Sequence, residues 1–322
     1  SPKSPGLRAL LTESGVAPGR APTSEEVAFR IAPRLNAAGR LDTARLALSL
    51  FEERDPARAG AIARELSTQN AQRQAIERRV TAEAREKVAR ECDLERDAVI
   101  LLAAAGWHRG VLGIAASRLA REYRRPVLLF SLEDGLARGS GRSIPGVSLH
   151  ETLKEIEGLF DEFGGHEQAV GASLPESDVE KLREAARALF AARVPAELFV
   201  PVDEAEASLS PGDVGAELLL WLEQLEPHGM GNPRPVFASR VRPAAPFRAL
   251  GTSGVRGRLE SGPGRDLACI SWRPDCLEAP APGVPLDVQF RLRRGRDGAP
   301  EAEIVAARPA RAFEASPAAV PA

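Results

Sequence analysis

The sequence predicts a multidomain protein of the α/β plus β class, in which a long connecting helix leads into an α/β domain and a small β-barrel follows. Three observations predict this fold. A helical stripe of apolar residues continues from Ala57 to about Glu91, with only Gly60 to interrupt it. Strand, helix and strand patterns come next, and beyond Pro195 the chain changes to short strand-like runs separated by Gly and Pro. A chain of 322 residues is long enough for two or three domains.

These patterns divide the chain into four segments. We expect a helical linker region with the long helix over residues 1–95 and an α/β domain over 96–197. A β domain is expected over 198–312 and a disordered tail over 313–322.

The composition is that of a soluble globular protein, with 43% hydrophobic and 27% charged residues. A net charge of −2 excludes a uniformly basic surface, although a local groove can still be positive. The three cysteines lack a C-x-x-C pair, which predicts buried thiols in a reducing cytoplasm and no zinc site. No apolar run is long enough to span a membrane. Because the chain starts at Ser1 and its only methionine is Met230, we expect a truncated or processed fragment.

Several helix signals precede the long helix. Leucines within residues 7–11 predict a short helix, and Ser24 followed by two glutamates predicts the start of another. We expect the stretch 30–40 to break at Pro33 and Gly39 and to form a corner between helices.

The next helix is predicted over Thr43–Glu52, and Asp55 with Pro56 then begins the long helix. The long helix would extend roughly 50 Å at about 1.5 Å per residue. Its polar side chains predict a solvated face made of Gln69, Asn70, Gln72, Arg73, Arg78 and Arg79.

The α/β domain begins with two buried strands. Ala98–Ala104 and Val127–Phe130 are apolar runs typical of such strands, and a helix pattern over Gly110–Tyr123 lies between them. This order favours a right-handed crossover within a parallel pair. Trp107 and His108, between the first strand and the helix, are interpreted as a packed loop pair. Further elements are predicted as strands over Gly135–Ser140 and Ala169–Leu174 and a helix over Glu176–Arg193.

Two glycine-rich segments of this domain are predicted as turns, joined by a segment with helical apolar spacing from Leu149 to Phe160. Glycines let the backbone approach a ligand, while guanidinium, imidazole and hydroxyl groups supply hydrogen-bond donors. Together the turns predict a cradle for a phosphate, whereas either turn alone is better explained as an ordinary surface turn. The candidate residues are Arg138, Ser140, Gly141, Arg142 and Ser143 in the first segment, and Gly164, Gly165 and His166 in the second.

A nucleotide-binding P-loop or Rossmann domain is the rival interpretation of a glycine-rich α/β chain. The sequence contains no G-x-x-x-x-G-K-[ST], and no G-x-G-x-x-G with its acidic follower comes after the first strand. Neither nucleotide-binding fold is therefore predicted.

The region beyond Pro195 is predicted to be mainly β-structure. A strand over Val202–Leu209, a helix over Asp213–Leu225 and a rigid turn over Pro227–Pro235 come first. Many short strands punctuated by Gly and Pro then predict a small barrel. The predicted strands are Val236–Val241, Phe247–Leu250, Val255–Leu259, Leu267–Trp272, Leu286–Leu292 and Ala302–Ala307.

Five stretches of the sequence resemble the RecJ family of single-strand-specific DNA exonucleases. GSGRSIPGVSLHETL followed by FGGHEQAVGASL resembles the DHH-associated domain of this family. RIAPRLNAAGRLDTA, WHRGVLGIAASRLAREYRRPVLLFS and LEPHGMGNPRPVF extend the resemblance, which covers the chain from about Pro5 to about Ala310.

The resemblance implies the C-terminal part of a 5′→3′ single-stranded-DNA exonuclease of recombination and repair. It implies that Ser140 and Arg142 hold a 5′ phosphate and that His166 contacts the scissile region. The RIAPRLNAAGR stretch of RecJ-like proteins lies close to the substrate path, which adds Arg34, Asn36 and Arg40 as candidates for contact with a DNA phosphate.

The resemblance also identifies the predicted barrel as an OB-type domain, a fold that binds single strands through basic and aromatic side chains. Trp272 is equally consistent with a place in the barrel core. The candidate DNA contacts are Arg256, Arg258, Trp272, Arg273, Arg291, Arg293 and Arg294.

RecJ-like nucleases hydrolyse DNA with Mn²⁺ or Mg²⁺, held by a DHH triplet and aspartates in a preceding domain. This sequence has no DHH triplet and no adjacent histidines. We therefore expect no catalytic residue and no bound metal in this chain, which would bind single-stranded DNA but not cleave it alone.

The expected partners are single-stranded DNA and, through the resemblance, a single-strand-binding protein and other repair proteins in the cytoplasm. Two alternatives stay open. One is a DHH-family phosphodiesterase that acts on short oligonucleotides or cyclic dinucleotides. The other is a non-catalytic module that binds single strands or recruits partners.

Overall fold

The computed structural model describes residues 2–41, 43–199, 205–229, 231–250, 254–262, 265–272 and 283–310. The chain divides into two compact units, Ser1–Pro201 and Val202–Ala322. Two sequence predictions, the disordered tail over 313–322 and the DNA contact of Arg273, lie outside the described residues.

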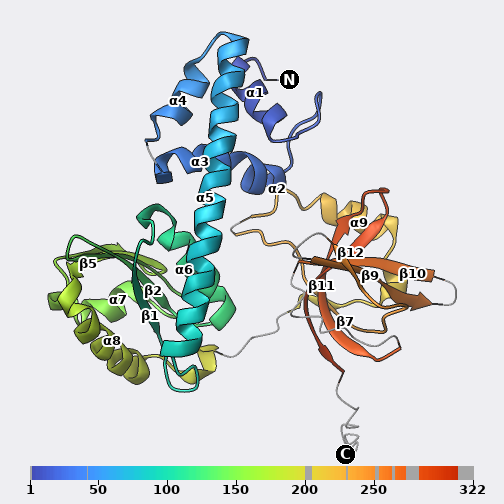
Figure 1. Cartoon of the computed structure of the whole chain (residues 1–322). Helices are drawn as coiled ribbons and strands as arrows, with labels where there is room; N and C mark the ends of the chain where they lie inside the picture. The colour runs from blue at the N-terminus through green and yellow to red at the C-terminus, as the bar shows by residue number, and fades with distance from the viewer. Residues whose placement is uncertain are drawn as a thin grey trace, which may run out of the picture. The chain divides into compact units, whose positions relative to one another are not determined.

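The first unit is organised around α5, a helix of 36 residues that begins where the sequence predicted it. Asp55 precedes this helix and its carboxylate accepts a hydrogen bond from the Arg58 amide, while Pro56 occupies the first turn. Figure 1 shows the N-terminal helices arranged around one end of α5. The helices are α1 (Pro5–Glu13), α2 (Ser24–Glu26), η1 (Val27–Ile31), α3 (Ala32–Leu41), α4 (Arg45–Glu52) and α5 (Pro56–Glu91).

The helix α5 takes part in two separate hydrophobic cores. Its first half contributes Ala63 and Leu66 to a core with Leu10 of α1 and Leu50 of α4. Its last turns contribute a second set of side chains to the core of the α/β layers, and Val80 begins that set. The helix therefore joins the helical region to the α/β region through one continuous backbone.

The predicted break between residues 30 and 40 is wrong, because this stretch is helical throughout. Pro33 lies in the first turn of α3, where a missing N–H is tolerated, and the π-helical turn η1 leads into it. Gly39 lies inside α3, and a Cβ built on it would only reach ordinary contact with Ala44. Neither residue therefore interrupts the helix.

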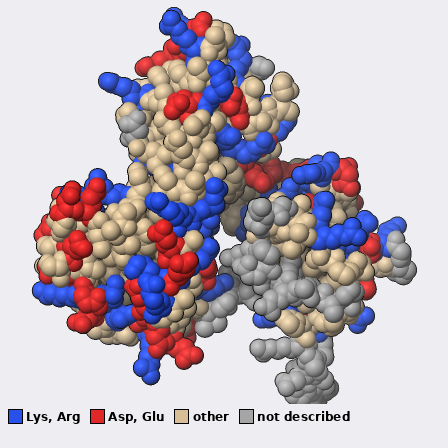
Figure 2. Space-filling view, in the orientation of Figure 1, with Lys and Arg blue, Asp and Glu red and all other residues tan. Residues whose placement is uncertain are grey.

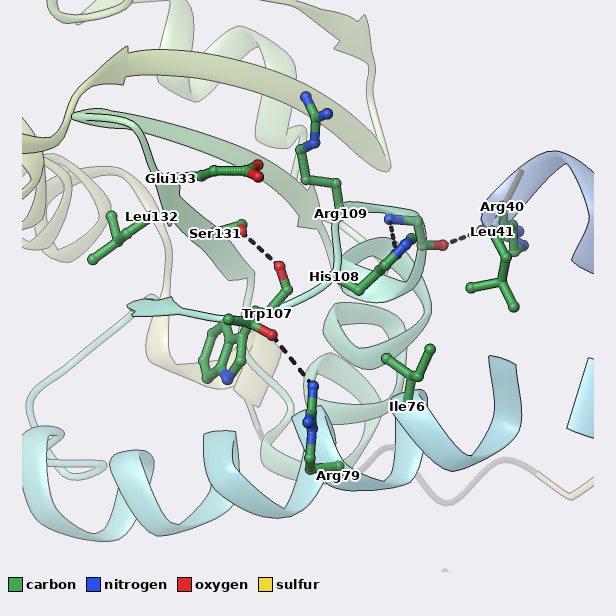
Figure 3. A pocket seen from close by; sticks show the side chains of 12 residues that line it. Arg40, Leu41, Ile76, Arg79, Trp107, His108, Arg109, Ser131, Leu132 and Glu133 are labelled. Atoms are coloured by element: carbon green, nitrogen blue, oxygen red, sulfur yellow. Dashed lines mark hydrogen bonds between the residues drawn. The ribbon is translucent and has the colours of Figure 1, made fainter. Parts of the chain in front are cut away.

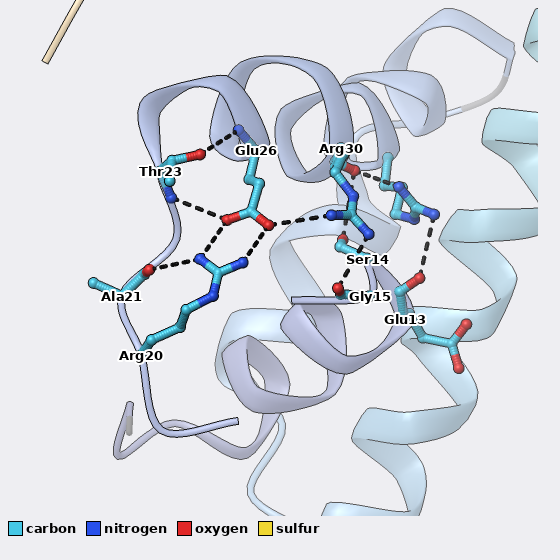
Figure 4. Close-up of polar contacts among 9 residues, drawn as sticks. Glu13, Ser14, Gly15, Arg20, Ala21, Thr23, Glu26 and Arg30 are labelled. Atoms are coloured by element: carbon cyan, nitrogen blue, oxygen red, sulfur yellow. Dashed lines mark hydrogen bonds and ion pairs between the residues drawn. The ribbon is translucent and has the colours of Figure 1, made fainter. Parts of the chain in front are cut away.

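Glu26, the last residue of α2, binds the segment of the chain that precedes this helix. Its carboxylate accepts hydrogen bonds from the Thr23 amide and from both terminal nitrogens of Arg20, at 2.7 and 2.5 Å (Figure 4). Arg30 donates to the same carboxylate at 3.1 Å and to the carbonyl of Gly15. The hydrogen bond from Arg20 lowers the pKa of Glu26 to about 2.

The α/β region contains a five-stranded sheet with the order β1-β2-β3-β5-β4. Strands β1 and β2 are parallel and α6 connects them, as predicted, while the other neighbours are antiparallel. The strands are β1 (Ile100–Ala105), β2 (Val127–Glu133), β3 (Leu136–Arg142), β4 (Glu162–His166) and β5 (Ala169–Pro175). The helices are α6 (Arg109–Tyr123), α7 (Leu149–Lys154), η2 (Glu157–Leu159), η3 (Glu176–Asp178), α8 (Val179–Arg193) and η4 (Ala196–Phe199).

Both glycine-rich segments that were predicted as turns are strands. The first segment forms β3 and the second forms β4. Packing explains the glycines of β3, because a Cβ on Gly139 would lie 2.4 Å from the Phe130 ring and one on Gly141 would lie 2.7 Å from Val170. Only Gly165 has a positive φ, at 151°, among the glycines of these two strands.

The second unit contains a seven-stranded sheet with the order β6-β7-β11-β12-β10-β9-β8. Amide hydrogen bonds join the segment after β7 to β9, from Ala244 to the Arg258 carbonyl and from Glu260 to the Arg242 carbonyl. The sheet therefore curls back on itself around a core that includes Phe237. The elements are β6 (Ala207–Ser208), η5 (Pro211–Asp213), α9 (Ala216–Glu223), β7 (Phe237–Val241), β8 (Arg248–Leu250), β9 (Gly254–Gly262), β10 (Arg265–Ser271), β11 (Leu286–Arg294) and β12 (Pro300–Pro309).

The predicted combination of α/β and β regions with a long connecting helix is confirmed. Across the described ranges, no helix combines the length and the apolar character that crossing a membrane requires.

Candidate anion-binding site

The sheet register brings the two glycine-rich segments together. Alternate residues of β3, including Ser140 and Arg142, project from the same face of the sheet. Ser140 lies opposite Gly171 of β5, and Gly171 lies opposite Gly164 of β4. A Cβ on either glycine would meet no atom within 4 Å. The hydroxyl of Ser140 therefore borders a strip of sheet without side chains.

The same register places the other predicted residues. Arg142 lies opposite Ala169, which lies opposite His166 at the exposed end of β4. Arg138 belongs to the same face of β3 as Arg142. The hydroxyl of Ser143 donates to the Val147 carbonyl at 2.7 Å, so this serine holds the following loop.

The guanidinium of Arg142 is held between β3 and α6. Its Nη1 donates to the Ser140 hydroxyl at 3.2 Å and to the Gly141 carbonyl at 2.6 Å. On the helix side, a Cβ on Gly113 would lie 2.5 Å from Nη2 of Arg142 and 3.2 Å from the Ser140 hydroxyl. Glycine at position 113 therefore makes the space in which this guanidinium lies.

The arginine at the end of α3 lies close to Arg142. Arg40 donates from Nη1 to the Gly110 carbonyl at 3.1 Å, at the start of α6. Burial lowers the pKa of Arg142, and the positive charge of Arg40 lowers it further. Within the residues that the structure describes, neither arginine has a carboxylate within 4.0 Å. The two guanidinium groups thus form a positive site without a counter-charge.

Of the two arginines predicted near the substrate path, the structure places only Arg40 beside Arg142. Asn36 is exposed one turn before Arg40 on α3. Arg34 instead joins three elements: its guanidinium donates to the Ser67 hydroxyl and to two backbone carbonyls, those of Glu13 and Arg30. Those bonds give Arg34 a structural role.

Arg73, which the sequence analysis placed on a solvated face of the long helix, is buried near Arg40. Arg73 of α5 is 9% exposed, and its pKa is lowered by burial and, after the opposing effect of Glu77, by the charges of Arg40 and Arg118. The prediction that Asn70 and Arg73 lie on a solvated face is therefore wrong. Their spacing in the sequence could have predicted this burial, because one helical stripe joins them to two apolar residues. The stripe contains Leu66, Asn70, Arg73, Glu77 and Val80.

A pocket of about 660 Å³ is lined by Arg40 among other residues (Figure 3). It opens where β1 and β2 end and α6 begins, the edge of a parallel pair at which ligands usually bind. The imidazole of His108 accepts a hydrogen bond from the Gly110 amide, and Ser131 donates to the Trp107 carbonyl at 2.6 Å. Arg40, Leu41, Ile76, Arg79, Gly106, Trp107, His108, Arg109, Gly110, Ser131, Leu132 and Glu133 line the pocket.

Trp107 and His108 are packed, as predicted, although both also line this pocket. Trp107 is 2% exposed, and its indole N–H donates to Glu83 at 2.7 Å.

Figure 2 shows Lys and Arg side chains gathered over the middle of α5, where the helical region meets the α/β layers.

In the second unit, four of the predicted contacts lie on one face of the sheet. Arg258 of β9 and Arg293 of β11 lie in one row across the strands, and Glu301 of β12 lies between them. Arg256 and Arg291 lie in the next row, with another glutamate between them. Each row thus contains arginines on both sides of one carboxylate, and the second row also includes Arg248 of β8, opposite Arg256.

The remaining contacts predicted there differ in exposure and pairing. Trp272 follows β10 and is 50% exposed, so the alternative that it is a core residue is not supported. Arg294 is bound to Glu223 of α9 through two hydrogen bonds, at 2.8 and 2.6 Å.

The divalent metals implied by the family resemblance do not fit the residues described. Within those ranges, no three His, Cys, Asp or Glu side chains come together in a group that could hold a metal ion.

Two families match segments of the chain. Residues 96–192 match the DHHA1 domain, and residues 205–296 match the RecJ OB domain. The α/β sheet and the β-rich unit therefore each correspond to a known domain.

Several relatives carry the name single-stranded-DNA-specific exonuclease RecJ. The Thermus thermophilus protein is 39% identical over 239 residues, which are 72% of this chain and 32% of that protein. The Bacillus subtilis protein is 37% identical over 232 residues, which are 71% of this chain and 29% of that protein. The Dickeya dadantii protein is 33% identical over 289 residues, or 87% of this chain and 50% of that protein. The chain thus spans half or less of these relatives.

A crystal structure of Thermus thermophilus RecJ in complex with Mg²⁺ resembles this chain with a TM-score of 0.78 at 32% identity. The resemblance covers 96% of this chain and 47% of that one.

Proposed function

We propose that this chain, which belongs to the RecJ family over the DHHA1 and RecJ OB domains that it contains, is the DNA-holding part of a 5′→3′ single-stranded-DNA exonuclease of recombination and repair. In this proposal, residues 1–95 are the helical linker region, 96–197 the DHH-associated domain and 198–312 the OB-type domain. The relatives that carry the name RecJ support the substrate class.

One observation carries the proposal: Arg40 and Arg142 both reach the first turns of α6, at the Gly110 carbonyl and beside Gly113, and no described carboxylate lies within 4.0 Å of either. Two guanidinium groups in a half-buried place repel each other, and a bound anion removes that repulsion. A phosphate suits the site because guanidinium groups donate to its oxygens in a fixed fork.

The number of arginines favours a terminal phosphate over an internal phosphodiester. A phosphate monoester carries about 1.5 to 2 negative charges near neutral pH, whereas a phosphodiester carries about one. Two uncompensated guanidinium groups match the larger charge. Ser140, Arg142 and Arg40 would therefore hold the 5′ phosphate. From there the strand would follow the open strip at Gly164 and Gly171 toward His166.

We further propose that the chain binds single-stranded DNA without cleaving it. The sequence contains no DHH triplet, and the side chains of the site are guanidinium and hydroxyl groups that bind and orient a phosphate. In the complete enzyme, divalent metals bound outside this chain would supply the attacking hydroxide.

The test is a titration of the 322-residue chain with a labelled 5′-phosphorylated single strand. Mn²⁺ is present, and degradation is followed in the same samples. Binding without cleavage supports the proposal. Cleavage that copurifies with the chain through several columns, or no binding at all, contradicts it.

A DHH-family phosphodiesterase for short oligonucleotides is a weaker second function, because residues 205–296 match a RecJ OB domain. A series of strand lengths separates the two, since an added OB-type domain should raise the affinity for longer strands.

We also propose a cytoplasmic location and partners such as a single-strand-binding protein, because the relatives process single-stranded DNA by name. Cell fractionation and an affinity pull-down with the purified chain would check both.

A further inference from the structure

A buried polar segment of α5 separates the two hydrophobic cores of the first unit. The helical core reaches Leu66, and the core of the α/β layers begins at Val80. Between them, Asn70, Arg73 and Glu77 occupy the inward face of α5 and are 6%, 9% and 3% exposed. Burying an ion pair is costly and rarely adds stability, so this segment calls for another explanation.

Glu77 holds two arginines that come from different helices. One carboxylate oxygen accepts a hydrogen bond from Arg73 of α5 at 2.6 Å, and the other accepts one from Arg118 of α6 at 2.6 Å. The side chain of Asn70 accepts from the second terminal nitrogen of Arg73 at 2.9 Å. Two of the three donor nitrogens of Arg73 are therefore fixed from one side.

The third nitrogen of Arg73 has no partner among the described residues. This Nε is buried and donates to no acceptor there. The charge of Arg73 lies close enough to Arg40 for each to oppose the other, and Arg40 lies beside Arg142. An unpaired buried donor next to two uncompensated guanidinium groups indicates an anion as the missing partner.

We propose that Glu77 is a positioning residue of the anion site, which fixes Arg73 as a third guanidinium for the phosphate that Arg40 and Arg142 bind. This inference rests on the proposed function of the site. Glu77 supplies the only counter-charge that hydrogen-bonds Arg73 in the described structure. Without the charge of Glu77, the Arg73 side chain would turn away from Arg40 and Arg142. If it stayed in place, its guanidinium would be buried without a counter-charge, which is costly.

The test compares the affinity of the full chain for one labelled oligothymidylate with either a 5′ phosphate or a 5′ hydroxyl. Glu77→Gln keeps the size of the side chain and one acceptor oxygen, but it removes the charge. We expect the preference for the 5′ phosphate to fall about tenfold, because Arg73 would no longer be held by a charge-assisted hydrogen bond. Binding of the 5′-hydroxyl strand should change little.

Glu122→Gln is the matched control. Glu122 also joins α5 to α6, through hydrogen bonds from Arg85 at 2.8 to 3.1 Å, but it lies outside the arginine cluster. This variant should keep the full preference. A merely structural role of Glu77 predicts equal losses for both strands and would overturn the proposal, as would an unchanged preference in Glu77→Gln.

Two further comparisons cover other outcomes. If Glu77→Gln does not fold, Arg118→Met serves in its place, because the Arg118 side chain is 48% exposed and its loss leaves Arg73 on Glu77. A smaller loss of preference is then expected, and no loss would overturn the inference. If the unaltered chain shows no preference for a 5′ phosphate, the proposed function itself fails, whatever the variants do.

Discussion

Arg40 and Arg142 of the first unit differ from Arg294 of the second unit in what balances their charge. Arg40 and Arg142 lie beside each other, and no described carboxylate lies within 4.0 Å of either. On the sheet of the second unit, a glutamate of β12 lies between two arginines in each of two rows, and Arg294 is held by Glu223. Both units contain many arginines, so their number alone does not locate a binding site. The informative feature is an arginine that the protein leaves without a counter-charge.

The largest expected effect comes from replacing Arg142, which tests whether an arginine without a nearby carboxylate binds the phosphate. Arg142→Ala should weaken binding of a 5′-phosphorylated strand by about ten- to a hundredfold, because a charge-assisted hydrogen bond is worth about 1.5–3 kcal/mol. Arg294→Ala removes an arginine that Glu223 already neutralises, so it should change the affinity less than about twofold. Fluorescence anisotropy with the same strand measures both. Similar losses in the two variants would mean that counter-charges do not distinguish the sites.

A second change displaces Arg142 without removing it. Gly113→Ala places a methyl group 2.5 Å from the original position of Nη2 of Arg142, and the guanidinium must move. We expect a severalfold loss of affinity for the phosphorylated strand. Gly60→Ala is the control, because its methyl group would meet only the Arg64 side chain, at 3.4 Å. It should leave binding unchanged and stabilise α5 by about 0.5–1 kcal/mol. Equal affinities for the two variants would show that the space at Gly113 does not matter.

The salt dependence of DNA binding is another way to tell which of the two arginines contacts a phosphate. Each phosphate neutralised by a protein cation contributes roughly 0.7 to the slope of log affinity against log salt for a single strand. Arg142→Ala should reduce this slope by about 0.7, whereas Arg294→Ala should leave it unchanged. Titrations at four salt concentrations measure the slope. A reduction in the Arg294 variant alone would assign the phosphate contact to the second unit.

The smallest expected effect is on the stability of the fold. It concerns Glu26, whose carboxylate accepts hydrogen bonds from Arg20 and Arg30. The pKa of Glu26 is about 2 in the folded chain, against an ordinary value of 4.5, chiefly because of the hydrogen bond from Arg20. A lowered pKa stabilises the fold above pH 4.5, and this stabilisation is lost as the pH falls toward 2. Glu26→Gln should lower the midpoint of thermal unfolding at pH 7, and the difference from the unaltered chain should vanish near pH 2. A difference that stays constant with pH would rule out this linkage.

Much of the fold could be predicted from local patterns. Asp55 and Pro56 mark the start of α5, because a cap and a first-turn proline act within a few residues. The parallel pair β1 and β2 follows from two apolar runs on either side of a helix pattern. The prediction failed at Pro33, because a preceding helical turn provided a place for the proline that sequence patterns do not show.

The candidate site was predicted less completely. The sequence pointed to Ser140, Arg142 and Arg40, whose positions in the structure agree with one site, although their role in binding stays a prediction. It assigned the glycines of β3 to a turn, since the contact between Gly139 and the Phe130 ring is not visible in the sequence. Arg73 was assigned to a solvated face because a charged residue on a long helix is normally exposed.

Local sequence patterns were enough to predict the long helix and the parallel strand pair, and they placed the candidate phosphate-binding side chains in a few short stretches. Tertiary structure decided which of those side chains have partners. The register of β3, β5 and β4 aligned Ser140 with Gly171 and Gly164, and the packing of α3 and α6 brought Arg40 to Arg142. The reason is physical: local patterns act within a few residues, whereas burial and charge balance depend on groups far apart in the chain.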